Sequence, residues 1–498
     1  MTTKSKLALM LISAACFYFS TGLETVWPLA WFAPLPVLYL AFRESAVSVG
    51  KRGKAWLRVG LIAWVAYFLG GLNQFTYFRL LMPLPLVPVA LALPALVLAA
   101  VVLLARFAYL RLAPAAAAFA FPALWTAWEF LFSRVSVHGT WGSLAYTQTD
   151  FLPLLQIASV TGLFGMTFVL MLVPSAVAVA LADFRRSQIA ATNTRTWSAL
   201  ILPAALVALV MGFGAWRLRE SPAHDDSHPS TVRVGLAATD NLPEDAFVNK
   251  DPATALEITR GYADRVRRLA AQGAQVIVLP EKFVGATPAD FDAIMKILGD
   301  VARDSNVTLV AGVNEFDPKP PRNLALVFAP TGRMEVEYDK RHMLPGPESG
   351  YVIGERPGLF LAPGTPWGVE ICKDMDFPRW ARVYGASGVR LLAVPAWDFV
   401  RDGRLHSRMA VVRGVENGFS IARAARNGLL TFSDAYGRVL AELSSNTQPD
   451  AMLVRDLPPG PSATFYTRHG DWFGWLSVAI AAGLIGMALL DAGILSRR

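Results

Sequence analysis

The sequence predicts a protein of two parts: a bundle of membrane-spanning helices, and a layered domain that combines strands with helices. Three observations lead to this fold class. First, 54% of the 498 residues are apolar and only 17% are charged, more apolar side chain than one soluble core needs. Second, the apolar excess is concentrated in residues 7–216 and 472–495. Third, the residues between these segments alternate between short β-rich runs and amphipathic helical runs, as in an α/β or α+β domain.

Eight apolar stretches are candidates for membrane-spanning helices. A helix rises about 1.5 Å per residue and the hydrocarbon core is about 30 Å thick, so roughly 20 apolar residues make one span. By this measure the expected spans are approximately 7–20, 23–42, 59–78, 84–105, 113–132, 151–182, 197–216 and 472–495. The first stretch is short and the sixth is long for a single span.

The positions of the basic residues predict how these spans are oriented. The connections on one side of the expected bundle hold Lys4, Lys6, Arg43, Lys51, Arg52, Lys54, Arg58, Arg106, Arg111, Arg185, Arg186, Arg195, Arg497 and Arg498. The short loops on the opposite side hold Arg79 and Arg134. Positive residues are retained on the cytoplasmic side, so we expect both termini inside and residues 217–471 outside. A cleaved signal peptide is the alternative for the first stretch, but further spans follow it directly.

The same patterns predict the domain organisation. We expect a membrane domain with spans one to seven over residues 1–219, followed by a polar linker over 220–230. An extracytoplasmic domain is expected over 231–457, and a proline-rich linker over 458–471 leads back to the membrane. Residues 472–498 then form the eighth span and a cytoplasmic tail.

Charge, histidine and cysteine usage exclude several classes of function. The net charge of +8 comes largely from residues at the ends of apolar stretches, and the soluble segment has no basic stripe with interleaved aromatics, so no nucleic acid is expected as a partner. The six histidines have no metal-ligand spacing and no glycine-rich phosphate loop occurs, so neither a metal nor a cofactor is expected. Cys16 lies in an apolar stretch and Cys372 in the soluble segment, which leaves Cys372 as a free thiol.

Three strand ends of the soluble domain carry reactive side chains. Glu281 follows the β-rich run 275–280, Lys340 follows Tyr338-Asp339, and Cys372 ends the run 368–372. A thiol nucleophile, a carboxylate that takes its proton and an ammonium that stabilises an oxyanion are the parts of an acyl-transfer site. Singly, each is more often a surface charge or a small core residue. Together, on three strand ends of one domain, they indicate a shared site.

Four further residues stand in or beside the apolar stretches. Trp125 and Glu129 lie in the fifth stretch, and Tyr146 and Gln148 lie in the loop that leads to the sixth. Polar groups at membrane depth are costly and usually face protein or a cavity, which makes these residues candidates for a membrane-side part of the site. Packing and interfacial anchoring are the more common alternative.

The sequence resembles the nitrilase superfamily and, within it, the apolipoprotein N-acyltransferase family. The matching residues of the soluble half are Pro280-Glu281, the run 340–345, Glu348, Ile371-Cys372, Ala396-Trp397, Arg413, Glu416 and the run 423–428. Those of the membrane half are Trp125, Glu129, the Gly139-Thr140-Trp141 turn, Tyr146, Gln148 and Gln156. The chain departs from the family's pattern at Leu279, Lys282, Lys373 and Asp374. These positions bear on the substrate more than on the thiol chemistry.

The resemblance implies a four-layer αββα sandwich and a role for each residue of the site. Glu281 is the implied general base, Lys340 stabilises the oxyanion and Cys372 is the nucleophile. Glu348 is the implied second carboxylate. The backbone N–H of Lys373 is the implied partner of the lysine in the oxyanion hole, and its side chain is expected to favour the thiolate.

The activity implied by the resemblance is a two-step acyl transfer through a thioester on Cys372. A phospholipid gives the acyl chain, and the N-terminal amine of a diacylglyceryl-cysteine lipoprotein receives it. The resemblance also implies a multi-pass monomer of the bacterial inner (plasma) membrane, with its catalytic domain on the periplasmic side. Two alternatives stay open: a membrane-tethered amidase in which water resolves the thioester, and a noncatalytic lipoprotein-binding factor that keeps the fold.

Overall fold

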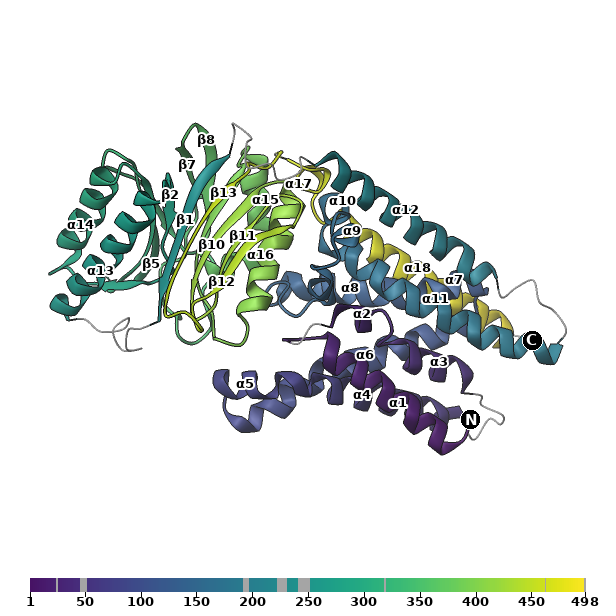
Figure 1. Ribbon diagram of the computed structural model, residues 1–498. Helices are drawn as coiled ribbons and strands as arrows, with labels where there is room; N and C mark the ends of the chain where they lie inside the picture. Colours follow the sequence, from purple (N-terminus) through teal and green to yellow (C-terminus); the bar gives the residue numbers. More distant parts are fainter. Residues whose placement is uncertain are drawn as a thin grey trace. The chain divides into compact units, whose positions relative to one another are not determined.

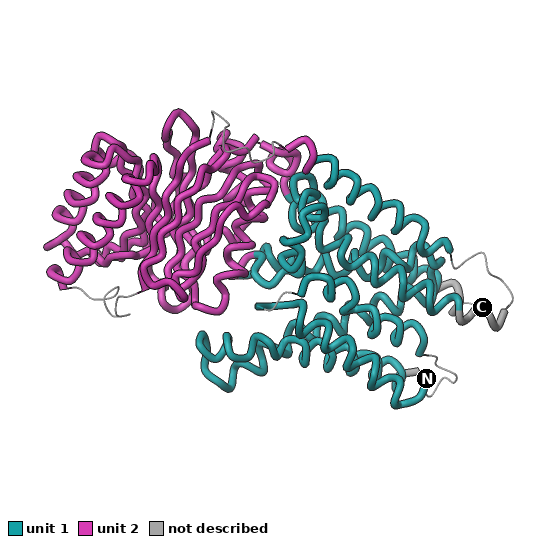
Figure 2. Tube along the Cα trace, viewed as in Figure 1, with its two compact units in different colours: residues 1–136, 140–217, 471–498 teal, residues 137–139, 218–470 magenta. Residues whose placement is uncertain are grey.

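The structure is a computed structural model that describes residues 1–23, 26–44, 52–190, 197–221, 231–240, 251–317, 319–461 and 463–496. These residues form two compact units (Figure 2). The first comprises residues 1–136, 140–217 and 471–498, and the second comprises 137–139 and 218–470. Residues 222–230 of the expected linker 220–230 lie outside the described residues. The expected domain boundaries stay predictions.

The first unit is a bundle of helices (Figure 1). Its helices are α1 (Thr3–Ser20), α2 (Trp27–Ala30), α3 (Leu35–Arg43), α4 (Arg52–Gly71), α5 (Phe75–Leu81), α6 (Val87–Tyr109), α7 (Pro114–Ala118), α8 (Ala120–Val135), α9 (Leu152–Leu155), α10 (Ala158–Thr161), α11 (Leu163–Ala190), α12 (Ser198–Glu220) and α18 (Trp472–Ser496). Short 3-10 helices at Leu72–Gln74, Leu84–Leu86 and Leu144–Gln148 join some of them. Proline occupies the first turn of several, including α6 and α7, where its missing N–H costs no helical hydrogen bond.

Six helical segments among the described residues are long and apolar enough to cross a membrane, fewer than the eight expected. They are Gly53–Leu81, Leu84–Tyr109, Pro114–Val135, Leu163–Phe184, Ser198–Glu220 and Trp472–Ala492. The first expected span is α1, whose first turn contains Lys4 and Lys6 and lowers its hydropathy. The second divides into the short helices α2 and α3. The long sixth stretch begins with α9 and α10 before the spanning helix α11 starts.

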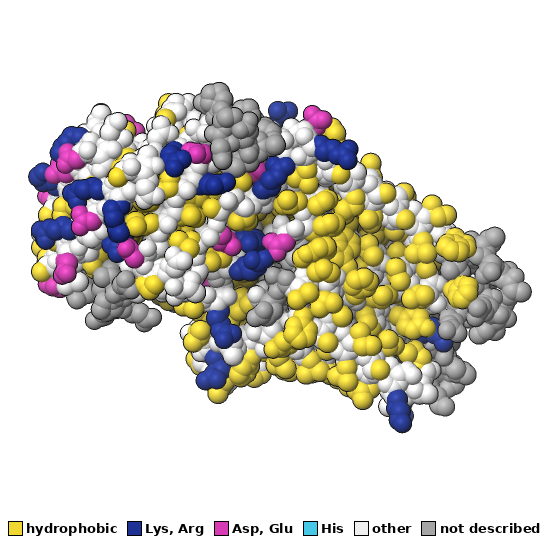
Figure 3. Space-filling view, in the orientation of Figure 1, with side chains coloured by type: hydrophobic (Ala, Val, Ile, Leu, Met, Phe, Trp, Pro, Cys, Tyr) yellow, Lys and Arg dark blue, Asp and Glu magenta, His cyan; other side chains and the backbone are white. Residues whose placement is uncertain are grey.

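Large apolar side chains cover the outside of the first unit (Figure 3). Leu57 on α4 and Leu490 on α18, for example, are 74% and 71% exposed. An apolar surface of this extent is unfavourable in water and is suited to the hydrocarbon core of a bilayer. The helices of this unit therefore have the surface that membrane-spanning helices require.

The second unit consists of two sheets with helices on their outer faces. Its helices are α13 (Pro252–Ala271), α14 (Phe291–Asp304), α15 (Pro378–Ala386), α16 (Gly403–Asn417) and α17 (Phe465–His469). Its strands are β1 (Val232–Thr239), β2 (Val276–Val278), β3 (Val284–Ala286), β4 (Thr308–Glu315), β5 (Arg322–Phe328), β6 (Met334–Asp339), β7 (Gly358–Ala362), β8 (Thr365–Val369), β9 (Leu391–Trp397), β10 (Ser420–Arg426), β11 (Leu429–Ser433), β12 (Val439–Ser444) and β13 (Asp450–Leu457). One sheet has the order β13-β1-β2-β4-β5-β6, with β3 beside β4, and the other has the order β12-β11-β10-β9-β8-β7.

Alternating side chains of the central strands build the layers of this unit. In β9, Leu391 and Ala393 belong to the core between the two sheets, whereas Leu392 and Val394 belong to the core under α15 and α16. In β2, Ile277 belongs to the core under α13 and α14. Because successive side chains of a strand point to opposite faces, an uninterrupted apolar run fits a strand that is covered on both sides. Figure 1 shows the resulting order of helices, sheet, sheet and helices, which is the four-layer αββα sandwich that the resemblance implied.

Candidate active site

The strands of the two sheets bring the three predicted residues to one place. Glu281, Lys340 and Cys372 follow the carboxyl ends of β2, β6 and β8. The Glu281 backbone N–H donates to the carbonyl of Ala396 (3.3 Å), and the Cys372 thiol donates to the carbonyl of Trp397 (3.5 Å). The end of β9 therefore contacts both the carboxylate residue of one sheet and the thiol residue of the other.

The ammonium of Lys340 lies between two carboxylates. Its Nζ is 2.8 Å from Glu281 Oε1 and 2.8 Å from Glu348 Oε2, and none of the three side chains is more than 4% exposed. Burial alone would lower the pKa of the lysine, but the attraction of the two carboxylates raises that pKa well above its ordinary value. Lys340 is therefore a fixed cation inside the domain.

Each of the two carboxylate oxygens of Glu348 accepts contacts from two donors. Oε1 accepts from Lys282 Nζ (2.6 Å) and Asn323 Nδ2 (2.8 Å), and Oε2 accepts from Lys340 Nζ and from the Leu344 backbone N–H (2.7 Å). Burial acts in the opposite direction, yet the two ammonium groups lower the pKa of Glu348 to about 2. This carboxylate is held as an anion.

Glu281 differs from Glu348 in having one unused oxygen. Its Oε1 accepts from Lys340 Nζ (2.8 Å) and from Asn323 Nδ2 (2.7 Å). No side chain or backbone donor among the described residues reaches Oε2. Since the two carboxylates share the same lysine and the same amide, the free oxygen of Glu281 is the one that can accept a proton.

Cys372 stands at a strained turn. Its φ of 43° lies in the left-handed region, which residues with a side chain seldom adopt, and it begins the 3-10 helix Cys372–Asp376, shortly after the end of β8 at Val369. Burial raises the pKa of the thiol well above its usual value, and the charge of Glu281 adds to this effect, whereas Lys340 opposes it. The resting thiol is therefore protonated and needs a base before it can attack a carbonyl.

The side chain of Lys373, which was expected to favour the thiolate, does not bring the thiol to a low pKa. The pKa of the Cys372 thiol is raised rather than lowered, and the ammonium of Lys373 is engaged elsewhere. Its Nζ contacts His138 Nδ1 at 3.2 Å and Asp376 Oδ2 at 3.4 Å. Residues 137–139 belong to the same unit as the layered domain. The predicted oxyanion role of the Lys373 backbone N–H does not depend on where the side chain points.

Asp374 holds the nucleophile turn against the loop that follows the lysine. Its carboxylate accepts from the backbone N–H groups of Ile371 (3.2 Å), Arg341 (3.1 Å) and His342 (2.8 Å), and from the hydroxyl of Tyr338 (2.8 Å). The sequence marked this position only as a departure from the family's pattern. The contacts show that it connects two segments of the site.

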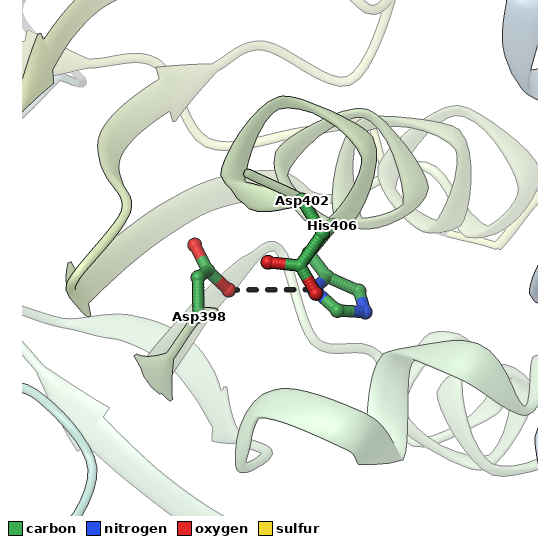
Figure 4. A group of neighbouring side chains, drawn as sticks. All are labelled: Asp398, Asp402 and His406. Carbon is green, nitrogen blue, oxygen red and sulfur yellow. Dashed lines mark ion pairs between the residues drawn. The ribbon is translucent and has the colours of Figure 1, made fainter. Parts of the chain in front are cut away.

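A second group of charges lies beyond the end of β9, and its spacing alone could hold a metal (Figure 4). His406 Nδ1 is 3.5 Å from Asp398 Oδ1 and 3.3 Å from Asp402 Oδ2. The guanidinium of Arg423, however, donates to both oxygens of Asp398 (2.5 and 2.9 Å). Burial alone would lower the pKa of His406, but the two carboxylates raise it to about 9. Two cations thus already balance the two aspartates, so these side chains do not fit a metal ion and form an ionic network.

The polar residues of the first unit hold a loop to the helices. Glu129 on α8 accepts from Trp125 Nε1 (2.9 Å), from the Ser143 hydroxyl (2.6 Å), from the Leu144 backbone N–H (3.0 Å) and from the Thr167 hydroxyl (2.8 Å). Four donors satisfy a buried carboxylate. These contacts favour the packing role for Trp125 and Glu129.

The other two membrane-side candidates have similar contacts within the first unit. Tyr146 shares a hydrogen bond of 2.6 Å with the hydroxyl of Thr140. Gln148 accepts from Trp31 Nε1 (2.8 Å) and donates to the carbonyl of Trp27 (3.0 Å). The 3-10 helix Leu144–Gln148 is therefore fixed from several sides, and a direct role of these residues in catalysis stays a prediction.

Sequence reasoning did not find Asn323, the amide that joins the two glutamates. It lies in β5 opposite Asn314 of β4, and both side chains are buried. A polar residue within an otherwise apolar strand was the available signal, because buried amides are kept where they have partners. Only the fold shows that its partners are Glu281 and Glu348.

Comparisons with known proteins agree with the division into two units. Residues 13–176 match the model of the apolipoprotein N-acyltransferase N-terminal domain, and residues 245–459 match the model of the carbon-nitrogen hydrolases. The chain is 27% identical to an apolipoprotein N-acyltransferase of Geobacter metallireducens, over 93% of this chain and 91% of the relative. It is 24% identical to that of Vibrio vulnificus, over 92% of each chain. A solved amidase from a Nesterenkonia species is 25% identical, with a TM-score of 0.41 over 49% of this chain and 97% of that one.

The two matches fall on the parts that the hydropathy pattern separates. The first covers apolar helices of the first unit, which confirms the membrane character. The second covers the sheets that carry Glu281, Lys340 and Cys372, which confirms the nitrilase-like fold. The chain is therefore similar to the apolipoprotein N-acyltransferases along more than nine tenths of its length, and its layered domain matches the carbon-nitrogen hydrolase model.

Proposed function

We propose that the protein is a membrane N-acyltransferase that moves a fatty acyl chain from a phospholipid, through a thioester on Cys372, to the N-terminal amine of a diacylglyceryl-cysteine lipoprotein. The relatives named apolipoprotein N-acyltransferase, which match the chain over more than nine tenths of its length, support the class of reaction and the acceptor. One observation carries the mechanism. The ammonium of Lys340 and the unused oxygen of Glu281 belong to one buried cluster that acts electrostatically on the thiol.

The first half of the reaction forms the thioester. Glu281 Oε2 takes the thiol proton while Cys372 Sγ attacks the ester carbonyl carbon of the phospholipid. The carbonyl oxygen becomes an anion, which the ammonium of Lys340 and the backbone N–H of Lys373 stabilise. Early N–H groups of a helix have no partner within it, so this N–H is suited to the task. The C–O bond then breaks, and Glu281 returns the proton to the leaving oxygen of the lysophospholipid.

The second half transfers the acyl chain to the amine. The neutral amine of the lipoprotein attacks the thioester carbonyl, and the same two donors hold the oxyanion. Glu281 takes a proton from the attacking nitrogen, the C–S bond breaks, and the proton passes to Sγ of Cys372. An amide is formed and the site returns to its starting state. Dividing one difficult exchange into two thioester steps is the advantage of a covalent nucleophile.

The hydrogen bonds support Glu281 rather than Glu348 as the base. Each oxygen of Glu348 accepts from two donors, and its pKa of about 2 makes it a very weak proton acceptor. Glu348 instead keeps the ammonium of Lys340 in place. Its role is to position the lysine, whereas Glu281 moves the proton.

The membrane helices suit this reaction because both substrates are anchored lipids. From the distribution of basic residues we place the catalytic domain on the extracytoplasmic side of a bacterial inner membrane, with both termini in the cytoplasm. The proposed working form is a monomer without a cofactor. We retain the domain boundaries expected from the sequence, with the catalytic domain over residues 231–457.

Incubation of the purified full chain with a phospholipid labelled in its acyl chain tests the proposal. We expect lysophospholipid and a labelled thioester on Cys372, and neither product from the Cys372→Ser variant. Release of ammonia from small amides, with no labelled protein, would instead identify an amidase. Full complementation of a deficient strain by Cys372→Ala would identify a noncatalytic binding factor.

A further inference from the structure

Lys282 adds a second ammonium to the polar centre of the site. It directly follows the proposed base, and its backbone has a φ of 48° in the left-handed region. Its Nζ is 2.6 Å from Glu348 Oε1 and lies 4.6 Å from the centre of the Tyr351 ring. The side chain is 11% exposed. Glu281 and Lys282 are adjacent in sequence, but Glu281 binds Lys340 whereas Lys282 binds Glu348.

We propose that Lys282 is a positioning residue that keeps Glu348 anionic, so that Glu281 alone exchanges the catalytic proton. The inference rests on the proposed function in taking Glu281 as the base. It assigns a role to Lys282, which the proposed mechanism leaves without one.

Charge balance is the first argument. Without Lys282, the single ammonium of Lys340 would face two carboxylates within 2.8 Å, and this buried group would carry a net negative charge. Two carboxylates that share a site cannot both stay ionised easily, and one of them takes up a proton at a raised pKa. With Lys282 present, two cations balance Glu281 and Glu348, and both can be anions.

The contacts of Glu348 show why this carboxylate is the one affected. The groups that face it are Lys282 after β2, Asn323 of β5, Lys340 after β6 and the Leu344 backbone N–H. Of the three side chains among these groups, only Lys282 binds Glu348 without also binding Glu281. Its removal therefore weakens the anion of Glu348 specifically and leaves the direct hydrogen bonds of Glu281 in place.

A proton on Glu348 would impair catalysis through Lys340. The ammonium would then attract Glu281 alone, which would make that carboxylate a weaker base for the Cys372 thiol. The neutral Glu348 would also hold the ammonium less firmly in the oxyanion site. Lys282 therefore extends the working range of the site toward low pH.

The rate of Cys372 alkylation by iodoacetamide as a function of pH tests this role. We compare the wild-type full chain in detergent with Lys282→Met, with Lys282→Arg and with Lys296→Met. Lys296 is a matched control because it also pairs with a carboxylate at 2.6 Å, but on the surface of α14. Loss of one charge-assisted hydrogen bond shifts a pKa by about one unit. At the acid midpoint of the wild-type profile, Lys282→Met should therefore react about fivefold more slowly, because the ionised fraction falls from about one half to about one eleventh.

The other variants separate charge from shape. Lys282→Arg should restore the wild-type midpoint, and Lys296→Met should not move it. In a Glu348→Gln background, Lys282→Met should cause no further shift. A Lys282→Met profile that matches the wild type overturns the inference, as does an equal shift in Lys282→Arg or an undiminished shift in the Glu348→Gln background. Lys282→Gln replaces the methionine variant if that variant does not fold.

The result is independent of the test of the proposed function. Alkylation reads the site directly and needs no acyl donor. If the wild type forms no acyl thioester but the midpoint shifts as described, the proposed function fails and the positioning role of Lys282 stands. If the thioester forms and the midpoint does not shift, the reverse holds.

Discussion

Replacing Asn323 by leucine should slow catalysis while leaving the fold nearly as stable. The amide donates one hydrogen bond to Glu281 (2.7 Å) and one to Glu348 (2.8 Å). A hydrogen bond to a charged group contributes about 1.5–3 kcal/mol when it is the main partner. Here each acceptor oxygen also retains its contact with a lysine ammonium in the variant, so we take a loss of about 1 kcal/mol for each hydrogen bond removed. A loss of about 2 kcal/mol corresponds to a rate about 30-fold lower.

The effect on the free energy of unfolding should be smaller because one buried atom of Asn323 already destabilises the fold. Its Oδ1 is buried, and no donor among the described residues reaches it. Removing an unsatisfied buried acceptor offsets the loss of the two donor contacts. We expect the unfolding midpoint in detergent to change by less than about 3 °C.

Single-turnover formation of the acyl thioester measures the rate, and Asn314→Leu is the matched control. Asn314 pairs directly with Asn323 across β4 and β5, is likewise buried, and also has an Oδ1 that no donor among the described residues reaches. Among the described residues, the amide that bonds to the two glutamates is that of Asn323 and not that of Asn314, so replacing Asn314 should change the rate less than about twofold. The reasoning is refuted if Asn323→Leu retains the wild-type rate, or if both variants lose the same fraction of activity.

Three further results should follow from the geometry. Above the acid limb that the carboxylates set, alkylation of Cys372 should still rise with pH beyond 9.0, the usual pKa of a thiol, because burial raises the pKa of this thiol, and a rate that no longer increases above pH 9 would contradict this. Asp374→Asn replaces an acceptor of three backbone N–H groups with an amide, so the unfolding midpoint should fall by about 6–10 °C. The raised pKa of His406 stabilises the fold fully below pH 6.5, and this stability is lost as pH rises through about 9. The wild-type midpoint should thus fall across that window, and His406→Asn should flatten the fall.

The layered fold was largely predictable because its central strands are short, uninterrupted apolar runs in the sequence. Runs such as Val276–Val278 and Leu391–Trp397 are apolar on both faces, which is typical of strands buried between two layers. The membrane part was predicted less well. A window of apolar residues does not reveal a break such as the one between α2 and α3. The backbone N–H and C=O groups at a turn inside a bundle can find their hydrogen-bond partners on neighbouring helices, so the turn needs no polar residues in its own sequence.

The grouping of Glu281, Lys340 and Cys372 at one site was predictable, but the contacts that set the properties of these side chains were not. Glu281, Lys340 and Cys372 each follow the carboxyl end of a strand, and the carboxyl ends of strands are where chemistry usually lies. The roles of Asn323 and Asp374 depend on segments that are distant in sequence and adjacent only in the folded domain. The sequence placed the charge of Lys373 next to the thiol, but only the fold shows that its ammonium contacts His138 and Asp376, and that burial raises the pKa of the thiol.

Intact-mass measurement of the protein isolated from membranes tests the proposed chemistry most directly. A fraction of the chains should carry the added mass of one fatty acyl group on Cys372, and hydroxylamine, which cleaves thioesters, should remove it. The Glu281→Gln variant should lack the adduct because its thiol has no base. Wild-type protein that remains unmodified when phospholipid is abundant, or an adduct on a residue other than Cys372, would contradict the thioester mechanism.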